Sequence, residues 1–140
     1  MIPPFDELGY LPPGIYEATL SEIEKRYTST RSRKWLFEGL KKLVKTLKSA
    51  GCKTLYLNGS YVTDKKDPGD YDAVWEYPGV DNTIDPVLRD GIDLWTIKRK
   101  YSGDVFCHMP QFFDYFTYFQ TDWRGIPKRI IKIDLEKMHD

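Results

Sequence analysis

Two segments with the character of β-strands lie close together near the middle of the chain, and they restrict the fold more than any other feature. Residues 53–58 alternate and are rich in Leu and Tyr, and residues 71–77 resume an apolar pattern after the turn pair Pro68-Gly69. We therefore expect them to be neighbouring strands of one sheet. A chain of 140 residues can bury one core without disulfides or a structural metal, so we predict a single domain over residues 1–140.

Two helices are predicted before these strands. Thr19 and Glu22 have the spacing of a capping box, which predicts a short helix to about Tyr27. Residues 34–50 predict a longer helix that ends at Gly51, with apolar positions at helical spacing at Leu36, Leu40, Leu43, Val44 and Leu47. The predicted fold is α+β, with a small mixed or antiparallel sheet covered by the two N-terminal helices.

The remaining segments give weaker expectations. Residues 1–18 contain Pro3-Pro4 and Pro12-Pro13-Gly14, and because proline restricts the backbone we expect an extended proline-rich arm. Further predictions are a helical turn over residues 85–90 and strands over residues 105–108 and 129–135. The aromatic run of residues 112–119 is expected to form a hairpin with the strand 129–135 through the turn cluster 123–127, with its rings in the core.

Charge is balanced overall but not along the chain. Lysine plus arginine number 21 and aspartate plus glutamate number 21, so the net charge of zero does not indicate a nucleic-acid partner. Basic residues crowd positions 31–53 and acidic residues crowd positions 64–93. A basic segment next to an acidic one is compatible with an anionic ligand that binds together with metal ions. Two solvated faces of opposite sign would give the same pattern.

Two cysteines, Cys52 and Cys107, are too few for a disulfide framework and lack the spacing of a zinc site. We expect both to be reduced. The N-terminal residues lack the pattern of a signal peptide, and no stretch approaches the ~20 apolar residues of a membrane span. These features predict a cytoplasmic protein with no membrane partner.

Residues that could bind a phosphate or a metal ion are concentrated in the connection between the two central strands. Glycine at Gly59 lets an anion approach the backbone, and Ser60 can bond a phosphate oxygen. Asp70 and Asp72 flank Tyr71, and because side chains alternate along a strand, their carboxylates emerge on one face roughly 6 to 7 Å apart. Such a pair suits Mg²⁺, which prefers oxygen ligands and shares them with phosphates. An ordinary turn with solvated aspartates has the same composition.

The joint pattern of apolar strand, Gly-Ser, spacer and Asp-x-Asp resembles the nucleotidyltransferase superfamily, which has the polymerase-beta-like fold. The resemblance implies that Gly59 and Ser60 bind the nucleotide phosphates and that Asp70 and Asp72 bind Mg²⁺. A looser similarity to a small uncharacterised bacterial family of minimal nucleotidyltransferase-like proteins involves Gly9-Tyr10-Leu11-Pro12-Pro13-Gly14, Gly51-Cys52-Lys53 and Ile133-Asp134-Leu135.

Active members of the superfamily usually add a third carboxylate from a later strand. The first candidate is Asp104, as a metal ligand and catalytic residue, and the second is Asp134. Members of the superfamily commonly carry an arginine just after Gly-Ser, and this chain has Tyr61-Val62-Thr63 there instead. The first cations here are Lys65 and Lys66, which we assign to the triphosphate, although a lysine binds phosphate only as a point charge.

The implied function is Mg²⁺-dependent transfer of a nucleoside monophosphate from an NTP to an acceptor, which the short chain suggests is a protein. The alternative is a nucleotidyltransferase-fold binding module, with or without catalysis, that acts as the antitoxin of a toxin–antitoxin or phage-defence pair. In that case the proline arm is expected to hold a toxin partner.

Overall fold

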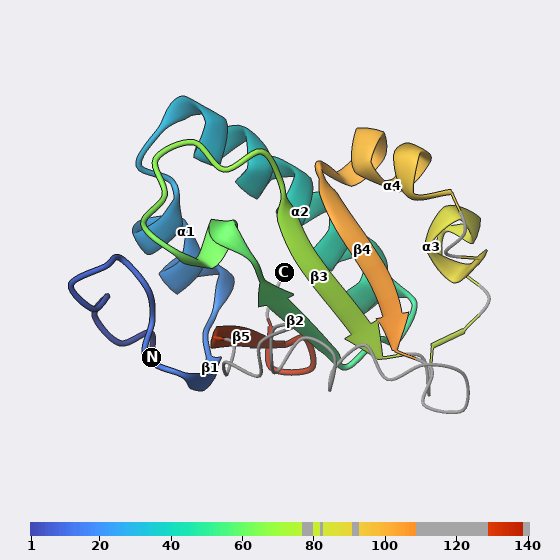
Figure 1. Ribbon diagram of the computed structural model, residues 1–140. Coiled ribbons are helices and arrows are strands. Elements are labelled where there is room, and N and C mark those ends of the chain that lie inside the picture. The colour runs from blue at the N-terminus through green and yellow to red at the C-terminus, as the bar shows by residue number, and fades with distance from the viewer. Residues whose placement is uncertain (77–79, 82, 91–92, 109–128, 139–140) are drawn as a thin grey trace.

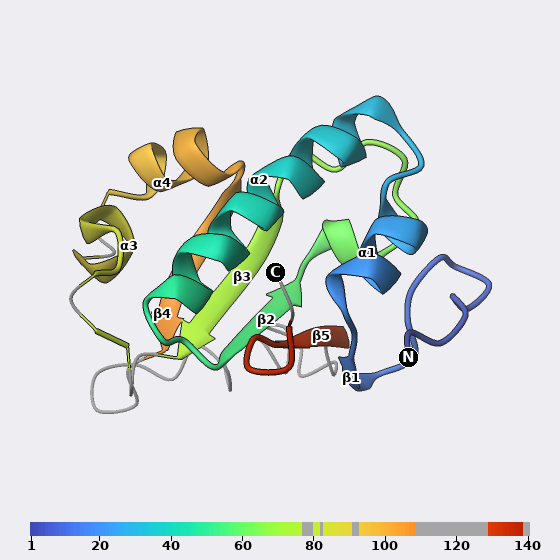
Figure 2. The same cartoon turned by 180° about the vertical axis from the view of Figure 1, so that it is seen from behind.

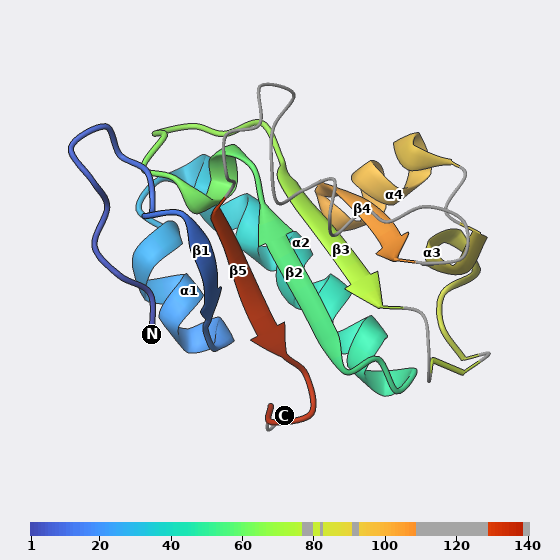
Figure 3. The same ribbon diagram turned by 60° about the horizontal axis from the view of Figure 1, so that its bottom comes forward.

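The fold is built on one five-stranded mixed sheet. The computed structural model describes residues 1–76, 80–81, 83–90, 93–108 and 129–138. The strand order is β1-β5-β2-β3-β4 (Figure 1, Figure 3). The strands are β1 (Gly14–Glu17), β2 (Thr54–Asn58), β3 (Tyr71–Glu76), β4 (Gly103–His108) and β5 (Arg129–Asp134). The predicted α+β class with a mixed sheet is therefore confirmed.

The direction of the strands follows from their connections. Strand β2 runs antiparallel to both β3 and β5, whereas β3 pairs with β4 in parallel, and β1 pairs with β5 in parallel. A parallel pair needs a crossover connection, usually helical, and the chain between β3 and β4 contains two helices. This crossover places the start of β4 beside the start of β3.

Four α-helices occur in the described residues: α1 (Leu20–Tyr27), α2 (Arg31–Ser49), α3 (Pro86–Asp90) and α4 (Leu94–Tyr101). Helices α1 and α2 lie over one face of the sheet, and α3 and α4 lie near β4 (Figure 2). The predicted capping box of Thr19 and Glu22 begins α1. The side chain of Thr30 caps α2, so this helix begins three residues before the predicted position 34.

The main core lies between the sheet and helices α1 and α2. Alternation along β3 sends Tyr71, Ala73 and Trp75 into this core. Val74 belongs instead to a small cluster with Ile130, against which Tyr56 and Phe106 pack. The odd and even positions of β3 thus face opposite sides of the sheet, and Asp72 emerges on the side away from α1 and α2.

The N-terminal segment differs from the predicted extended arm. Residues 14–17 form β1, an edge strand held by its parallel pairing with β5. The sequence does not indicate this strand, because it has only four residues and begins at the glycine of a Pro-Pro-Gly run. The segment before it lies on the molecule itself. The Arg26 guanidinium donates to the carbonyls of Ile2 and Pro3 at 3.1 and 2.9 Å, and Leu11 is fully buried.

The predictions for the remaining segments have different outcomes. Helix α3 and strands β4 and β5 match the predicted turn and strands, whereas α4 is not predicted by the sequence pattern. The aromatic hairpin of residues 112–119 lies outside the described residues. Both cysteines are free thiols. Within the described ranges, none of the helices has the length and apolar character needed to span a bilayer.

Candidate functional site

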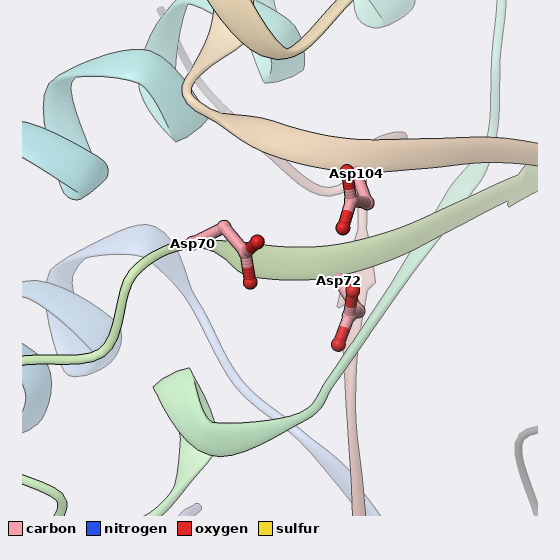
Figure 4. Close-up of side chains that lie close together, drawn as sticks. All are labelled: Asp70, Asp72 and Asp104. Atoms are coloured by element: carbon pink, nitrogen blue, oxygen red, sulfur yellow. The ribbon is translucent and has the colours of Figure 1, made fainter. Parts of the chain in front are cut away.

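Three aspartates come together where β3 and β4 begin. Asp70 directly precedes β3, Asp72 lies within it, and Asp104 is the register partner of Asp72 on β4. Each contributes a carboxylate oxygen, and these oxygens all lie within 4.8 Å of one another (Figure 4). Alternation along β3 places the first two on one face, and the parallel register adds the third. The structure thus brings together both aspartates of the Asp-x-Asp pair and the first candidate for the third carboxylate.

The proximity of these acids changes their ionisation. Partial burial raises the pKa of Asp104, and the negative charge of Asp70 raises it further. A hydrogen bond between the two carboxyl groups acts in the same direction, since it favours the protonated acid. The positive charge of Lys98 opposes these effects without cancelling them. A divalent cation would remove the repulsion that raises this pKa.

Lys98 is a member of the site that the sequence pattern does not indicate. It lies on α4, and its ammonium donates to Asp70 Oδ2 at 2.8 Å. The hydrogen bond and charge of Asp70 raise the pKa of Lys98, with smaller contributions from Asp104 and Asp72. Because α4 is not predicted from the sequence, nothing in the sequence places this lysine beside the aspartates.

The Gly59-Ser60 turn lies against the acidic cluster. Gly59 has φ +86°, a conformation that side chains disfavour, and a Cβ added to it would collide with the Asp72 carboxylate. Residues Ser60–Val62 then form a short 3₁₀-helix, in which the Val62 N–H donates to the Gly59 carbonyl at 3.2 Å. The two residues predicted to bind phosphate therefore adjoin the predicted metal ligands.

A buried arginine holds the loop after this turn. Arg33, on α2, is only 2% exposed. Its guanidinium donates to the carbonyls of Tyr61, Thr63 and Lys65 at 2.7 to 2.9 Å, and it lies over the rings of Tyr27 and Tyr61. In sequence Arg33 is one of many cations in residues 31–53, so composition alone does not distinguish it.

The structure places Lys65 and Lys66 in an exposed stretch whose backbone is tied to α2. Arg33 donates to the carbonyl of Lys65, and the Thr30 hydroxyl donates to the carbonyl of Lys66 at 3.1 Å. The backbone of both residues is thus fixed by the start of α2. Among the described residues, the lysine with its ammonium on the acidic cluster is Lys98.

Asp134 and His108 lie at the other end of the sheet. Asp134 pairs with Thr54 on β2, whereas Asp72 pairs with Asn58, so about 13 Å of strand separates the two positions. The Asp134 carboxylate accepts from the backbone N–H of Glu136 and lies 3.7 Å from the Lys137 ammonium. The backbone of His108 pairs with Glu76, and its side chain lies outside the described residues. Asp104 is therefore the third carboxylate of the cluster.

Comparison with known proteins gives one match. The model of a family of unknown function, DUF6932, matches residues 3–134, which include every residue of the acidic cluster, the Gly-Ser turn and α4. Neither the curated proteins nor the solved structures give a match. Because the match extends over nearly the whole chain, this protein belongs to the DUF6932 family.

Proposed function

We propose that this protein is a minimal nucleotidyltransferase that uses Mg²⁺ to transfer a nucleoside monophosphate from an NTP to an acceptor. The observation that carries the proposal is the cluster of Asp70, Asp72 and Asp104, with carboxylate oxygens within 4.8 Å, beside a Gly-Ser turn. We also infer that the fold is the minimal polymerase-beta-like fold, since the strand order joins the Gly-Ser turn, the Asp-x-Asp strand and a third aspartate on the neighbouring strand.

The donor set fits magnesium. Mg²⁺ is a hard cation that takes oxygen ligands, and it is usually held by one or two carboxylates together with substrate phosphates. Asp72 and Asp104 stand on paired strands, which limits their movement and keeps their carboxylates together. When bound, the metal would polarise the phosphoryl oxygens and stabilise charge on the attacking and leaving oxygens.

The protein's own residues would do the rest. The lack of a side chain at Gly59 lets the turn lie against the Asp72 carboxylate, so a phosphate that bonds the Ser60 hydroxyl would lie beside the proposed metal ligands. The acceptor hydroxyl would lose its proton to a carboxylate of the cluster, and Asp104, on β4 beside Asp72, is the candidate for this base. The acceptor oxygen would then bond to the α-phosphorus as the bond to the β-phosphate breaks, and pyrophosphate would leave.

The alternative of an antitoxin-like binding module has less support. The short chain and the lack of an arginine after Gly-Ser favour it, and so would an exposed proline arm. The segment before β1 lies against α1, however, with Leu11 buried and Phe5 edge-on to Tyr27 at 6.0 Å between ring centroids. A binding module without catalysis has no need of the acidic cluster, so metal and NTP binding distinguish the proposed function from that form of the alternative.

Titration calorimetry with Mn²⁺, and with each NTP in the presence of Mg²⁺, tests the proposal. The variant Asp70→Asn/Asp72→Asn is expected to lose both kinds of binding. The variant Asp134→Asn removes an aspartate outside the cluster and is expected to bind like the unmodified protein. Absence of metal binding by the unmodified protein, or equal binding by the double variant, would refute the metal site and favour a protein-binding role.

A further inference from the structure

We propose that Lys98 is a switchable substrate-binding residue, which neutralises Asp70 when no metal is bound and transfers its ammonium to the substrate's triphosphate when a divalent cation arrives. This inference rests on the proposed function and assigns the triphosphate contact to α4. The sequence suggested Lys65 and Lys66 for this role, but the ammonium that the structure places on Asp70 is that of Lys98.

The backbone of Lys98 is held firmly beside the acidic cluster. Helix α4 begins at the N-cap Asp93, whose carboxylate accepts from the Thr96 N–H at 3.1 Å. At its other end the Tyr71 hydroxyl donates to the Tyr101 carbonyl at 2.7 Å, which joins the helix to the first residue of β3. Asp70 directly precedes that residue, so the position of the lysine relative to Asp70 is set by the core.

Two glycines, one on α2 and one at the start of β4, allow the elements around α4 to pack closely. A Cβ on Gly39 of α2 would collide with the Tyr101 carbonyl, and one on Gly103 would lie 2.5 Å from the Tyr71 ring. Helix α4 is therefore in close contact with α2 and with the strand that carries the aspartates. A rigid helix with a flexible lysine can move the ammonium without moving the backbone.

The ammonium itself is free to exchange partners. The side chain of Lys98 is 41% exposed and that of Asp70 is 27% exposed, and the contact between them is a single hydrogen bond of 2.8 Å. Water screens an ion pair of this kind and makes it weak. A doubly charged cation competes with a single ammonium for the same carboxylate, and three carboxylate oxygens within 4.8 Å favour the cation.

Displacement would put the lysine where the substrate brings negative charge. Mg²⁺ sites commonly share their ligands with substrate phosphates, so a triphosphate bound with the metal would bring negative charge to this cluster. An ammonium released from Asp70 remains tethered beside this position and can bind phosphate as a point charge. Metal binding and phosphate binding are thereby coupled through one side chain.

Calorimetry on three variants tests this coupling, with Mn²⁺ alone and with tripolyphosphate at saturating Mn²⁺ as probes. Tripolyphosphate carries no base, so the result does not depend on which NTP is the substrate. Lys98→Met is expected to bind Mn²⁺ alone about two- to fivefold more tightly, because the competing charge is gone. The same variant is expected to bind tripolyphosphate about tenfold more weakly or worse. Lys98→Arg keeps the charge and is expected to bind tripolyphosphate within about threefold of the unmodified protein.

Lys100→Met is the matched control, since it removes an equal charge from the same helix but from a lysine paired with Asp85. It is expected to leave both affinities unchanged. If Lys98→Met weakens Mn²⁺ and tripolyphosphate binding together, Lys98 only maintains the site and the proposal is wrong. Unchanged tripolyphosphate binding in Lys98→Met would also overturn it. Failure of the unmodified protein to bind Mn²⁺ would instead refute the proposed function itself.

Discussion

Two cations occupy contrasting environments in this protein. Arg33 is buried among backbone carbonyls and aromatic rings, whereas the side chain of Lys98 is 41% exposed and donates to the carboxylate of Asp70. The carbonyls around Arg33 belong to the chain and cannot be exchanged for a ligand. The carboxylate beside Lys98 belongs to a cluster that suits a metal. Arg33 therefore maintains the loop, whereas Lys98 is placed where it can exchange its partner.

The chemistry of the two side chains matches these environments. The planar guanidinium of Arg33 has five donors in a fixed fork, which serve carbonyls on several residues at once. The ammonium of Lys98 is a compact charge on a flexible stem, and it can follow a charge that moves. A lysine at position 33 would lack the fork that serves these carbonyls together.

The largest expected effect comes from Arg33→Met. This change leaves the buried carbonyl of Tyr61 and the partly buried carbonyls of Thr63 and Lys65 without their donor, and each lost partner in a buried place costs about 1–3 kcal/mol. We expect the free energy of unfolding to fall by about 3 kcal/mol or more, measured by urea denaturation. Lys41→Met, at an exposed position of the same helix paired with Glu38, should change it by less than about 1 kcal/mol. Similar values for the two variants would contradict a structural role for Arg33.

A smaller effect is expected at the Gly-Ser turn. Gly59→Ala forces a side chain into φ +86° and against the Asp72 carboxylate, so we expect a loss of about 2 kcal/mol of stability together with weakened Mn²⁺ binding. Gly69→Ala is the control, because a Cβ at this position meets nothing within 4 Å. Denaturation and calorimetry on both variants measure the two effects. Normal Mn²⁺ binding by Gly59→Ala would separate the turn from the metal site.

The smallest expected effect is a pH dependence due to Asp104. Its pKa is raised in the folded protein, so the unfolded chain releases this proton first as the pH rises. Without metal, stability should therefore fall as the pH rises from about 3.9, the ordinary aspartate value, through the raised pKa. After solvent screening we expect this change to be below about 1 kcal/mol.

Asp104→Asn should abolish that part of the pH dependence, which urea denaturation across this range would detect. In the unmodified protein, Mn²⁺ affinity should change in the opposite sense and weaken as the pH is lowered, because a metal ligand must be deprotonated. A pH profile of stability that is identical in Asp104→Asn would show that the burial and neighbouring charge of Asp104 have no measurable consequence.

Local sequence patterns predicted the elements that depend on local interactions. The helix of residues 34–50, the paired strands at 53–58 and 71–77, and the shared face of Asp70 and Asp72 follow from helical spacing and from alternation. These features need no information about distant residues. Strand β1 escaped prediction because it forms by pairing with β5, more than a hundred residues away in the chain.

The sequence by itself determined the class of the fold, the Gly59-Ser60 turn and the Asp70-Tyr71-Asp72 pair, since neighbouring residues specify strands and turns. Only the tertiary structure decided that Asp104 rather than Asp134 joins the pair, because the parallel register of β3 and β4 aligns Asp104 with Asp72 and the antiparallel register of β5 puts Asp134 at the far end. It also decided the positions of Arg33 beside the loop carbonyls and of Lys98 beside Asp70. Both side chains extend from helices, and packing rather than sequence spacing sets where a helix lies.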